Sequence, residues 1–573
     1  MKKIAFLSLL VFLFTGCDGF LDSENLVKKD TSSFPETSQD ALDALTGVYS
    51  ILPSVNVNQC TFLVSELLSD DRLGGGAAVD RSWAAMDQLK KINDDMFPDF
   101  WKKMYQGIFR SNMLLETLDV VKTWEKPELK DQIAAEARFL RAYFYFELVK
   151  RYGGVPIIGD KVYELNENIE LPRSTFEQCI KYIVSELDDI KDDLRSLPLP
   201  DAAASAHVVN TQAAQALKIR VLLYAASPLF NEKPIESGNE LIGYASYDRE
   251  RWKIAADAAR NFINTYGTGD GAIMGLDDNF KNVFTNWYSN EHKEVIFFRE
   301  NAMDKTVETA NGPLGLSGAK QGNGRTNPTQ NLVDAFLMKD GHFINDKGKY
   351  EYNEQLPYAQ RDPRLEYTII HNGSSWVNST METWQGGANN PLGSSYSLTS
   401  YYMRKFMGDF EAANEYQDTQ HNWVMFRYAE ILLNFAEAEN EYLSTPSQAV
   451  YDAIIALRRR AGIEPGEKNL YGLTTNEQTH NLTQAEMRKV IQNERRIELA
   501  FEEHRYWDIR RWRLAEQVYA QPIQGMYITK SQTSTTYVPQ SVLNVQWDNK
   551  RYFYPIPYSE VIKNKNMVQN PNW

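Results

Sequence analysis

Cysteine is scarce in this chain: only three occur among 573 residues, at positions 17, 60 and 179. Three cysteines cannot build the disulfide framework of a small secreted domain. Cys60 and Cys179 are able to pair, but we interpret them as buried free thiols. Basic residues are also few, with 61 Lys and Arg against 76 Asp and Glu and a formal net charge of −15. Because nucleic acids and anionic membranes bind basic surfaces, this balance argues against both as partners.

Recognisable catalytic motifs are absent as well. The sequence contains no HExxH, GxxxxGK[ST] or GxSxG motif, and "GLSGA" departs from the last by one position. The seven His residues form no cluster with the spacing of metal ligands. We therefore predict no catalytic residues, no metal and no cofactor. Glu430, Glu437 and Glu441 share one helical face, but we expect them to face solvent or the arginines of "LRRRAG" rather than to form a catalytic carboxylate pair.

Long apolar runs are confined to the front of the chain. The run Ile4–Phe14 follows Lys2 and Lys3, and it is too short to span a bilayer as a helix. Small residues then precede Cys17 in "FTGC", as a lipoprotein signal peptidase requires, although Phe14 stands where Leu is usual. We predict a signal peptide at 1–16 and a lipid on Cys17, which becomes the mature N-terminus. An ordinary secretory signal with a chance cysteine is the alternative.

Several segments carry the apolar periodicity of helices. A capping box of Ser174 with Glu177 opens a helix with one apolar stripe, and Thr483 with Glu486 opens another helix. The stretch 135–154 is apolar on nearly all sides and ends at two glycines, which predicts a buried helix. Further segments form helix pairs, namely 215–230 with 249–266 and 427–443 with 448–463. These pairs favour a stack of helical hairpins, although no 34-residue repeat is visible.

The character of the sequence changes between 268 and 420. This part is rich in Gly, Asn, Ser and Trp and lacks helical periodicity, which predicts long loops on a rigid scaffold, where function usually lies. The chain also holds 12 Trp and 31 Tyr. A sugar ring presents flat C–H faces and a rim of hydroxyls, so a glycan site needs an exposed Trp or Tyr with Asp, Asn and Arg around it.

Two loops, at 69–87 and 284–291, supply both residue types, and later loops add more. For any single tryptophan, packing in the core is the alternative to ligand contact. The ligand-binding residues that we predict are Asp71, Arg72, Arg81, Trp83, Trp287, Tyr288, Asn311, Trp376 and Trp384.

Five stretches spread along the chain carry a family resemblance. They are "EARFLRAYFYFELVKRYGGVPII", "NPTQNLVDAF" (327–336), "RYAEILLNFAEA" (427–438), "NERRIELAFEEHRYWDIRRW" (493–512) and the C-terminal "YPIPYSEVIKNKNMVQNPNW". Together, and in this order, they resemble the SusD/RagB family, the outer-membrane nutrient-binding lipoproteins of Bacteroidetes. "CDGFLD" after the signal resembles the usual mature start of this family, whereas "NPNW" departs from its usual ending "NPGY".

The resemblance implies a mainly α-helical unit, in which four tetratricopeptide-like helix pairs form a scaffold. An irregular region packed on this scaffold would carry the ligand site. It implies an N-terminal region at 17–230 and a second region at 231–573, whose loop-rich part is 268–420. It also implies a lipid-anchored protein at the cell surface, which covers a SusC-like TonB-dependent transporter in the outer membrane as a lid. The ligand in this family is an oligosaccharide or a peptide.

The function that we expect is non-catalytic binding of a nutrient oligosaccharide and its delivery to the transporter. A RagB-like peptide binder would keep the fold and the partner and change the ligand. A surface glycoside hydrolase would need two carboxylates across a cleft, and a helical-repeat adaptor would need no small ligand. Tryptophan in the loops favours a glycan binder over an adaptor, but it does not separate glycan from peptide.

Overall fold

Helices make up most of the regular structure. The computed structural model describes residues 35–53, 69–74, 98–164, 167–198, 206–285, 287, 293–391, 397–474 and 482–573. The longer helices in these ranges are α1 (Ser38–Tyr49), α4 (Pro98–Thr117), α5 (Leu129–Tyr152), α6 (Phe176–Ile190), α7 (Thr211–Ala226), α9 (Glu250–Tyr266), α14 (Tyr428–Tyr442), α15 (Gln448–Ala461) and α16 (Gln484–Glu498).

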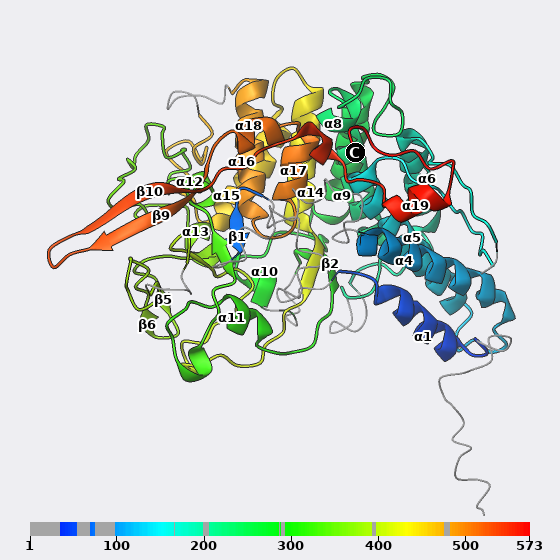
Figure 1. Ribbon diagram of the computed structural model, residues 1–573, viewed down its shortest axis with the longest axis horizontal. Helices are drawn as coiled ribbons and strands as arrows, with labels where there is room; N and C mark the ends of the chain where they lie inside the picture. Colours follow the sequence, from blue (N-terminus) through cyan, green and yellow to red (C-terminus); the bar gives the residue numbers. More distant parts are fainter. Residues whose placement is uncertain are drawn as a thin grey trace, which may run out of the picture.

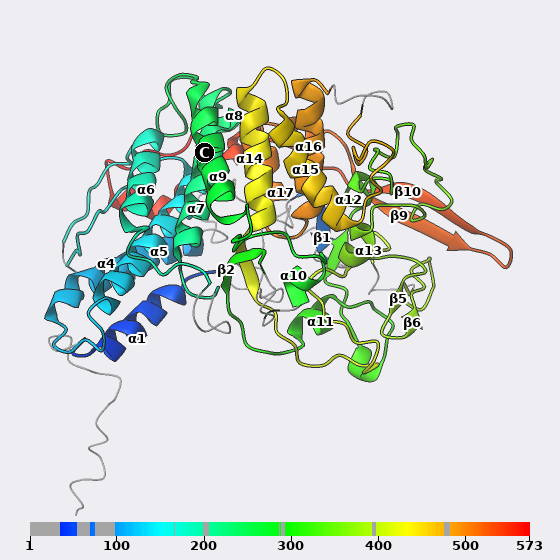
Figure 2. The same ribbon diagram turned by 180° about the vertical axis from the view of Figure 1, so that it is seen from behind.

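These helices stack side by side across the molecule (Figures 1 and 2). In chain order α4 packs on α5, α5 on α6, α6 on α7, α7 on α9, α9 on α14, and α14 on both α15 and α16. The segments predicted as helix pairs are therefore neighbours in the structure. None of the helices in the described ranges is long and apolar enough to cross a membrane.

The predicted helix starts are correct at one capping box and shifted at the other. Thr483 and Glu486 form the expected box at α16. At α6 the box consists of Thr175 and Gln178, one residue later than the predicted Ser174 and Glu177. The reason is that the N–H of Ser174 donates to the carbonyl of Val155, which keeps Ser174 in the preceding extended connection. The side-chain cap can form only at the next residue.

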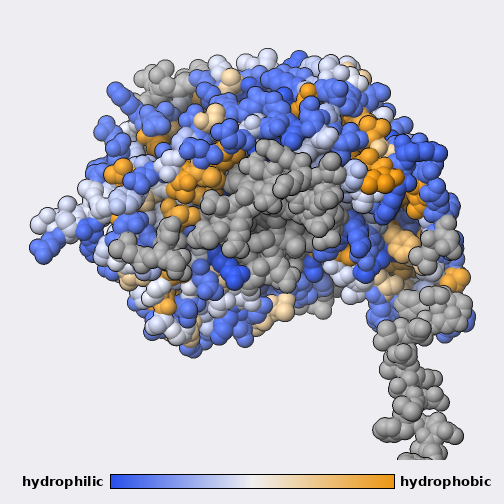
Figure 3. All heavy atoms as spheres, viewed as in Figure 1, coloured by the Kyte–Doolittle hydropathy of each residue, from blue (hydrophilic) through white to orange (hydrophobic). Residues whose placement is uncertain are grey.

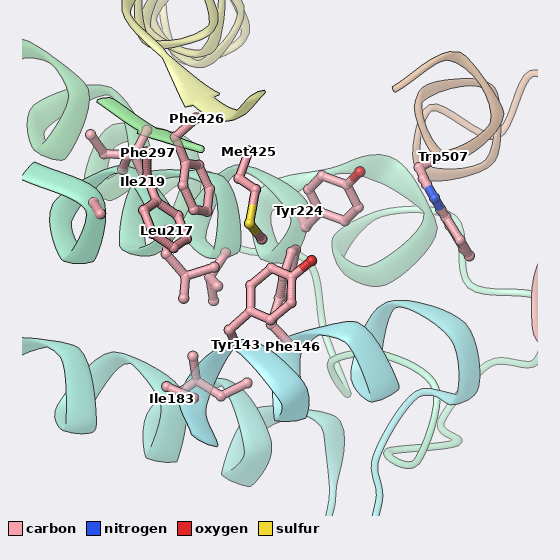
Figure 4. Close-up of a cluster of buried hydrophobic side chains, with 14 of the residues drawn as sticks. Tyr143, Phe146, Ile183, Leu217, Ile219, Tyr224, Phe297, Met425, Phe426 and Trp507 are labelled. Carbon is pink, nitrogen blue, oxygen red and sulfur yellow. The ribbon is translucent and has the colours of Figure 1, made fainter. Parts of the chain in front are cut away.

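Helix α5 is buried along most of its length, as its apolar sequence predicts. It ends at Gly153, whose φ of 74° is a conformation that favours glycine. Figure 4 shows the core on one side of α5, where Tyr143 and Phe146 face residues of α6, α7 and two strands. Helix α6 adds Cys179, a buried free thiol, and burial raises its pKa to about 11. Cys60 lies outside the described residues.

The region 268–420 is irregular, as predicted, and consists of short elements. Its helices are α10 (Asn282–Thr285), α11 (Thr306–Asn311), α12 (Gln330–Ala335) and α13 (Arg364–Thr368). Within it β4 (Ile369–Ile370) pairs antiparallel with β7 (Tyr402–Met403), and β5 (Ser375–Trp376) with β6 (Ser379–Thr380). Its strand β2 (Val295–Arg299) pairs antiparallel with β8 (Trp423–Arg427), which follows the region.

A second hydrophobic core holds this region together and is separate from the core of the helix stack. It is closed by a hairpin of β9 (Ile523–Lys530) and β10 (Thr535–Leu543), in which Met526 and Ile528 are buried. The hairpin projects from one end of the molecule, and α1 lies at the other end (Figures 1 and 2). The remaining short helices are α8 (Pro228–Asn231), α17 (Arg505–Arg511), α18 (Ala515–Tyr519) and α19 (Tyr558–Lys563).

A buried ionic network joins the two cores. Arg427 at the end of β8 donates to Glu294, Glu498 and Glu502 over 2.7 Å each. Arg364 of α13 lies 2.7 Å from Glu494 and 2.8 Å from Glu498, both on α16. Because every one of these charges has an oppositely charged partner, the network fixes the loop-rich region to the helix stack.

Candidate functional site

Asp71 and Arg72 lie in the interior of the molecule, on and beside the short strand β1 (Arg72–Gly74). This strand pairs with β3 (Thr326–Pro328), so it inserts the segment 69–74 against the loop-rich region. The carboxylate of Asp71 accepts a hydrogen bond from Nε of Arg496 at 2.7 Å. Arg72 lies 3.9 Å from the carboxylate of Glu503.

Asp70 strengthens the same anchor. Its carboxylate accepts from Arg505 at 2.8 Å and from Arg496 at 2.8 Å. Burial alone would raise the pKa of Asp70, but the two guanidinium groups outweigh burial and hold the pKa well below its usual range. Asp70, Asp71 and Arg72 therefore fix the described segment 69–74, with which the loop predicted at 69–87 begins. Arg81 and Trp83, which we predicted on this loop, lie outside the described residues.

A small polar cavity adjoins this anchor. Its volume is about 70 Å³, and Arg151 at its wall stacks on Phe100 at 3.9 Å and on Trp507 at 4.6 Å. Burial raises the pKa of Glu503 to about 7, against the attraction of Arg72, Lys150 and Arg151. The other residues that line the cavity include Tyr143, Glu147, Lys150, Arg220, Tyr224, Trp423, Glu502 and His504.

This cavity is a site that the sequence did not indicate. Its charged groups come from α5, from Arg220 of α7 and from the turn before α17, which are far apart in the chain. Ligand pockets for drug-sized molecules usually have about 300–1,000 Å³, so a cavity of this size does not enclose a sugar chain. Glu147 is neutralised by Lys150 and Arg151 at 2.5 Å each.

Trp287 packs in a small hydrophobic cluster that includes Phe298 of β2. It is 8% exposed, its ring centroid lies 5.3 Å from that of Phe298, and its indole N–H donates to the carbonyl of Gln420 at 3.0 Å. The arrangement holds the ring by edge and face contacts inside the cluster. Tyr288, the predicted neighbour, lies outside the described residues.

Asn311 and Trp376 are both buried in the loop-rich region. The side-chain amide of Asn311 donates to the carbonyl of Val307 at 2.8 Å, at the end of α11. Trp376 is 1% exposed and donates its indole N–H to the hydroxyl of Tyr416 at 3.0 Å. In this conformation both side chains contribute to packing, and neither presents a face to solvent.

Trp384 is the predicted tryptophan whose ring is half-buried and partly open to solvent. It lies where the hairpin of β9 and β10 meets the loops, with Nζ of Lys530 5.4 Å from its ring centroid. Glu382, two residues before it, lies 3.7 Å from Lys530. We call Trp384, Glu382 and Lys530 the hairpin platform. It joins an apolar ring face to a carboxylate and an ammonium, the groups that a sugar ring requires.

Sequence reasoning missed Glu382 and Lys530. The alternation of "IQGMYITK" and "TTYVPQSVL" is the signal for a strand pair, and it would have placed Lys530 in a strand. The long-range contact between this strand and the loop of Trp384 has no local signature, because it depends on how the second core closes.

Carboxylates on α14 form no catalytic pair. Glu430, Glu437 and Glu441 are each bound to an arginine, but they face neither solvent nor the arginines of "LRRRAG", contrary to our prediction. Glu430 accepts from Arg220 at 2.6 Å, Glu437 from Arg511 and Glu441 from Arg488, at 2.5 Å each. In the described part of the chain, no group of three or more His, Cys, Asp or Glu side chains is placed to hold a metal ion.

Comparison with known proteins finds relatives of this chain in one family. The sequence profile of the SusD family matches residues 293–573, and a second profile, described as starch-binding associating with outer membrane, matches residues 20–223. SusD-like protein P2 of Formosa agariphila is 24% identical over 585 residues, which cover 99% of this chain and 98% of the relative.

Solved structures share the fold along nearly the whole chain. A SusD-like carbohydrate binding protein of Bacteroides fragilis is 25% identical, with a TM-score of 0.71 over 94% of this chain and all of the other. A laminarin-binding SusD-like protein is 20% identical, with a TM-score of 0.63 over 93% of this chain and 99% of the other. The mainly α-helical scaffold and the family resemblance are thereby confirmed, and the chain belongs to the SusD/RagB family.

Proposed function

We propose that this protein is a non-catalytic glycan-binding lipoprotein of the cell surface, which captures a nutrient oligosaccharide for import. The observation that carries this proposal is the match of both halves of the chain to SusD-family profiles, one of them described as starch-binding. Two of the solved structures with this fold are described as carbohydrate binding and laminarin binding.

The chemical groups of the hairpin platform also support the proposal. The open part of the Trp384 ring suits the C–H face of a sugar, and Glu382 and Lys530 are 42% and 46% exposed at its edge. These two groups are placed to accept and donate hydrogen bonds with hydroxyls. Arg81, Trp83 and Tyr288 remain predicted contacts of the same ligand.

The test is calorimetric titration of the purified protein with malto-oligosaccharides and with laminarin oligosaccharides. If the platform binds, Trp384→Ala weakens the affinity about 5- to 30-fold, which corresponds to about 1–2 kcal/mol. Trp124→Ala is the matched control, since Trp124 is also half-buried but packs on the core of the helix stack. Equal affinities of the two variants would remove the platform from the ligand site.

Binding to peptide and glycan arrays tests the peptide alternative. A RagB-like binder has the same fold, so the fold does not discriminate between the two ligands. Binding to a peptide library with no response to any glycan on an array would replace the oligosaccharide by a peptide in the proposal.

We further propose that the protein does not cut its ligand. A glycosidase needs a carboxylate acid and a second carboxylate on opposite sides of the scissile bond. Glu503 has a raised pKa, but it borders a cavity of about 70 Å³, and Glu147 on the same wall is bound by two cations. Prolonged incubation should return a bound oligosaccharide unchanged in chromatography, and shorter products from pure protein would support the hydrolase.

The partner in the proposal is a SusC-like TonB-dependent transporter. A binder held by lipid at Cys17 does not carry its ligand across the outer membrane, so import requires a separate channel protein. Tethering both proteins to one membrane raises their effective concentration, so a modest affinity is sufficient. Extraction in mild detergent and affinity purification of this protein should recover a large barrel in near-equal amount, with or without nutrient. Recovery of the protein alone would indicate a free-standing receptor.

A further inference from the structure

The polar cavity beside Glu503 lies in the interior of the helix stack, between α5, α7, β8 and the turn before α17. We call it the α5 cavity. One buried water needs about 10–15 Å³ of such space, so a cavity of about 70 Å³ has room for about five waters or for one small ion. The outer face of the molecule is mostly hydrophilic (Figure 3), and water solvates the polar groups there. The polar groups of the α5 cavity need partners inside the protein.

Two tyrosine hydroxyls face this cavity from neighbouring helices. Tyr143 on α5 and Tyr224 on α7 are 5% and 4% exposed, and neither hydroxyl has a hydrogen-bond partner among the described residues. Burial raises the pKa of both hydroxyls well above the usual range, so both keep their protons. Figure 4 shows both hydroxyls on the side of the core where Trp507 lies. A buried hydroxyl without a partner is costly, so each of the two indicates a missing acceptor.

His504 and Trp507 add two N–H donors from the opposite wall. Nδ1 of His504 accepts from Arg495 at 3.1 Å, because a guanidinium group only donates. Burial holds the pKa of His504 well below its usual range, so the ring is neutral and carries its one proton on Nε2. The indole N–H of Trp507, a side chain that is 3% exposed, has no partner in the part of the chain that the structure describes. These groups donate only, so an acceptor has to satisfy them.

The cations at the wall of the cavity exceed the carboxylates that bind them. Glu147 is bound to both Lys150 and Arg151, at 2.5 Å each, and one carboxylate neutralises only one of two cations. Arg220 is neutralised separately by Glu430 at 2.6 Å. Lys150 carries three N–H donors and uses one for Glu147. A single negative charge in the cavity would balance the excess and accept from this ammonium group.

Glu503 competes with such an anion. Burial raises its pKa to about 7. The ionised form supplies the missing negative charge, whereas the protonated form leaves the place to an anion. Burial also lowers the pKa of Lys150 to about 8. Both groups therefore lose the proton that favours an anion as the pH rises. The charged and titratable groups around Glu503 are Arg72 of β1, Tyr143, Glu147, Lys150 and Arg151 of α5, Arg220 and Tyr224 of α7, and Glu502 and His504 beside it in the chain.

We propose that the α5 cavity binds one small monovalent anion, of the size of chloride, formate or acetate. Tyr143, Tyr224 and Lys150 donate to it, and its charge balances the second cation bound to Glu147. A metal ion would meet donors and cations instead of ligands, a dianion would exceed the single charge in excess, and a sugar chain exceeds the volume. The site lies apart from the hairpin platform and does not depend on the proposed function.

Calorimetric titration of the purified protein with sodium formate, acetate and chloride tests the site. Sodium gluconate keeps the ionic strength constant, because gluconate is too large for the cavity. We expect one anion per chain, an affinity that falls at least about fivefold from pH 6 to pH 8, and uptake of a fraction of a proton at pH 7. Saturation by phosphate or glycerol in place of the monovalent anions would overturn the inference. So would the absence of saturation below about 0.1 M, which would leave water alone in the cavity.

A tyrosine pair locates the bound anion. Tyr224→Phe keeps the ring and removes one donor, so the affinity should fall about fivefold or more, and Tyr143→Phe should give a similar loss. Tyr152→Phe is the matched control. Tyr152 is a buried tyrosine of α5 whose hydroxyl also has no partner in the described ranges, but it does not line the cavity. This control should bind as the wild type does. Equal affinities of all three variants would place the anion elsewhere and refute the site.

Glu503→Gln isolates the pH effect. Glutamine has nearly the shape of the protonated carboxyl and does not ionise, so this variant should bind the anion more tightly than the wild type at pH 8. Its proton uptake at pH 7, obtained by calorimetry in two buffers of different ionisation enthalpy, should be much smaller than that of the wild type. A variant that keeps the pH dependence of the wild type would show that the anion does not compete with Glu503, and the assignment to this cavity would fail.

Discussion

Arginine side chains fill much of the interior of this protein. Arg364, Arg427, Arg458, Arg510 and Arg511 are among its largest fully buried side chains. Two of these, Arg510 and Arg511, belong to the stretch "YWDIRRWR" (506–513). Arg511 is neutralised by Glu437 of α14 and by Asp508 of its own helix. Arg510 instead lies over the ring of Tyr506 at 3.3 Å and donates to the carbonyl of that residue. A large core is able to hold such pairs when each charge has its partner and its hydrogen bonds.

A prediction at this scale concerns Arg427. Replacing it by Met leaves Glu294, Glu498 and Glu502 with fewer cations in a site that water does not reach. We expect the free energy of unfolding to fall by about 3–5 kcal/mol in urea denaturation. Lys122→Met is the control, because Lys122 and Glu36 form an exposed pair, and exposed pairs contribute about 0–1 kcal/mol. A similarly small loss of stability in both variants would show that removing Arg427 leaves no costly unpaired charge in the interior.

Glu503 gives a prediction of pH dependence. Its folded pKa is about 7, mainly because burial disfavours the carboxylate, whereas an unfolded chain has a Glu pKa of about 4.3. Between these values the folded protein holds a proton that the unfolded chain releases, so this group's contribution to stability is present below about pH 4 and is lost as the pH rises through 7. Glu147, Glu502, His504, Lys150, Arg151, Arg220 and Arg72 face the same cavity or contact Glu503.

Glu503→Gln removes this titration. The wild type should lose up to about 3 kcal/mol relative to the variant between pH 5 and pH 8, measured by urea unfolding at each pH. Glu467→Gln, at an exposed position, serves as the control and should follow the wild type. Parallel stability curves for wild type and Glu503→Gln would mean that the carboxyl titrates normally.

At the scale of elements, the helix stack depends on close approach between neighbours. A Cβ atom at Gly107 on α4 would lie 2.5 Å from the ring of Phe144 on α5, which is far inside van der Waals contact. The absence of a side chain at this position therefore sets the distance between the two helices. Gly47 on α1 differs, because nothing lies within 4 Å of the corresponding atom.

These two glycines form a matched pair for a prediction. Gly107→Ala should destabilise the protein by about 1–3 kcal/mol, because the added methyl group displaces Phe144 from a packed core. Gly47→Ala should stabilise it by up to about 1 kcal/mol, since alanine has the higher helix propensity and meets no obstacle. Thermal unfolding of both variants checks the signs. A gain of stability in both would show that α4 and α5 move apart easily.

At the scale of the whole molecule, two separate hydrophobic cores support the two ends of the fold. The helix stack has α1 at one end of the molecule, and the second core supports the hairpin platform at the other end (Figures 1 and 2). The network around Arg427 and Arg364 joins the two.

The whole-molecule prediction concerns the anchor. Cys17→Ala removes the thiol that would carry the lipid, so the protein should leave the membrane fraction and lose its accessibility to protease on intact cells. One acyl chain binds a membrane only marginally and several chains bind stably, so the effect should be nearly complete. Cys179→Ala, which alters a buried thiol of α6, should stay in the membrane fraction. A Cys17→Ala protein that stays membrane-bound and lipid-labelled would disprove the anchor.

The sequence by itself determined the helices and their order. Apolar periodicity is a local property, and it located α14 and α15 to within two residues at each end. It also located α5, although that helix begins at Leu129, before the predicted stretch 135–154. The capping box at α16 is equally local. Five short stretches in a fixed order were sufficient for the family, and the family supplied the mainly helical fold with an irregular region on it.

Only the tertiary structure decided which polar and aromatic residues face water. Trp376 and Trp384 occur in similar Gly- and Asn-rich loops, yet the first is in the second core and the second is half-open beside Lys530. The sequence predicts Asp71 and Arg72 in a loop, but both are buried. Their partners Arg496 and Glu503 come from more than 400 positions away in the chain. Burial and ion pairing result from long-range packing, which composition and spacing within a loop do not encode.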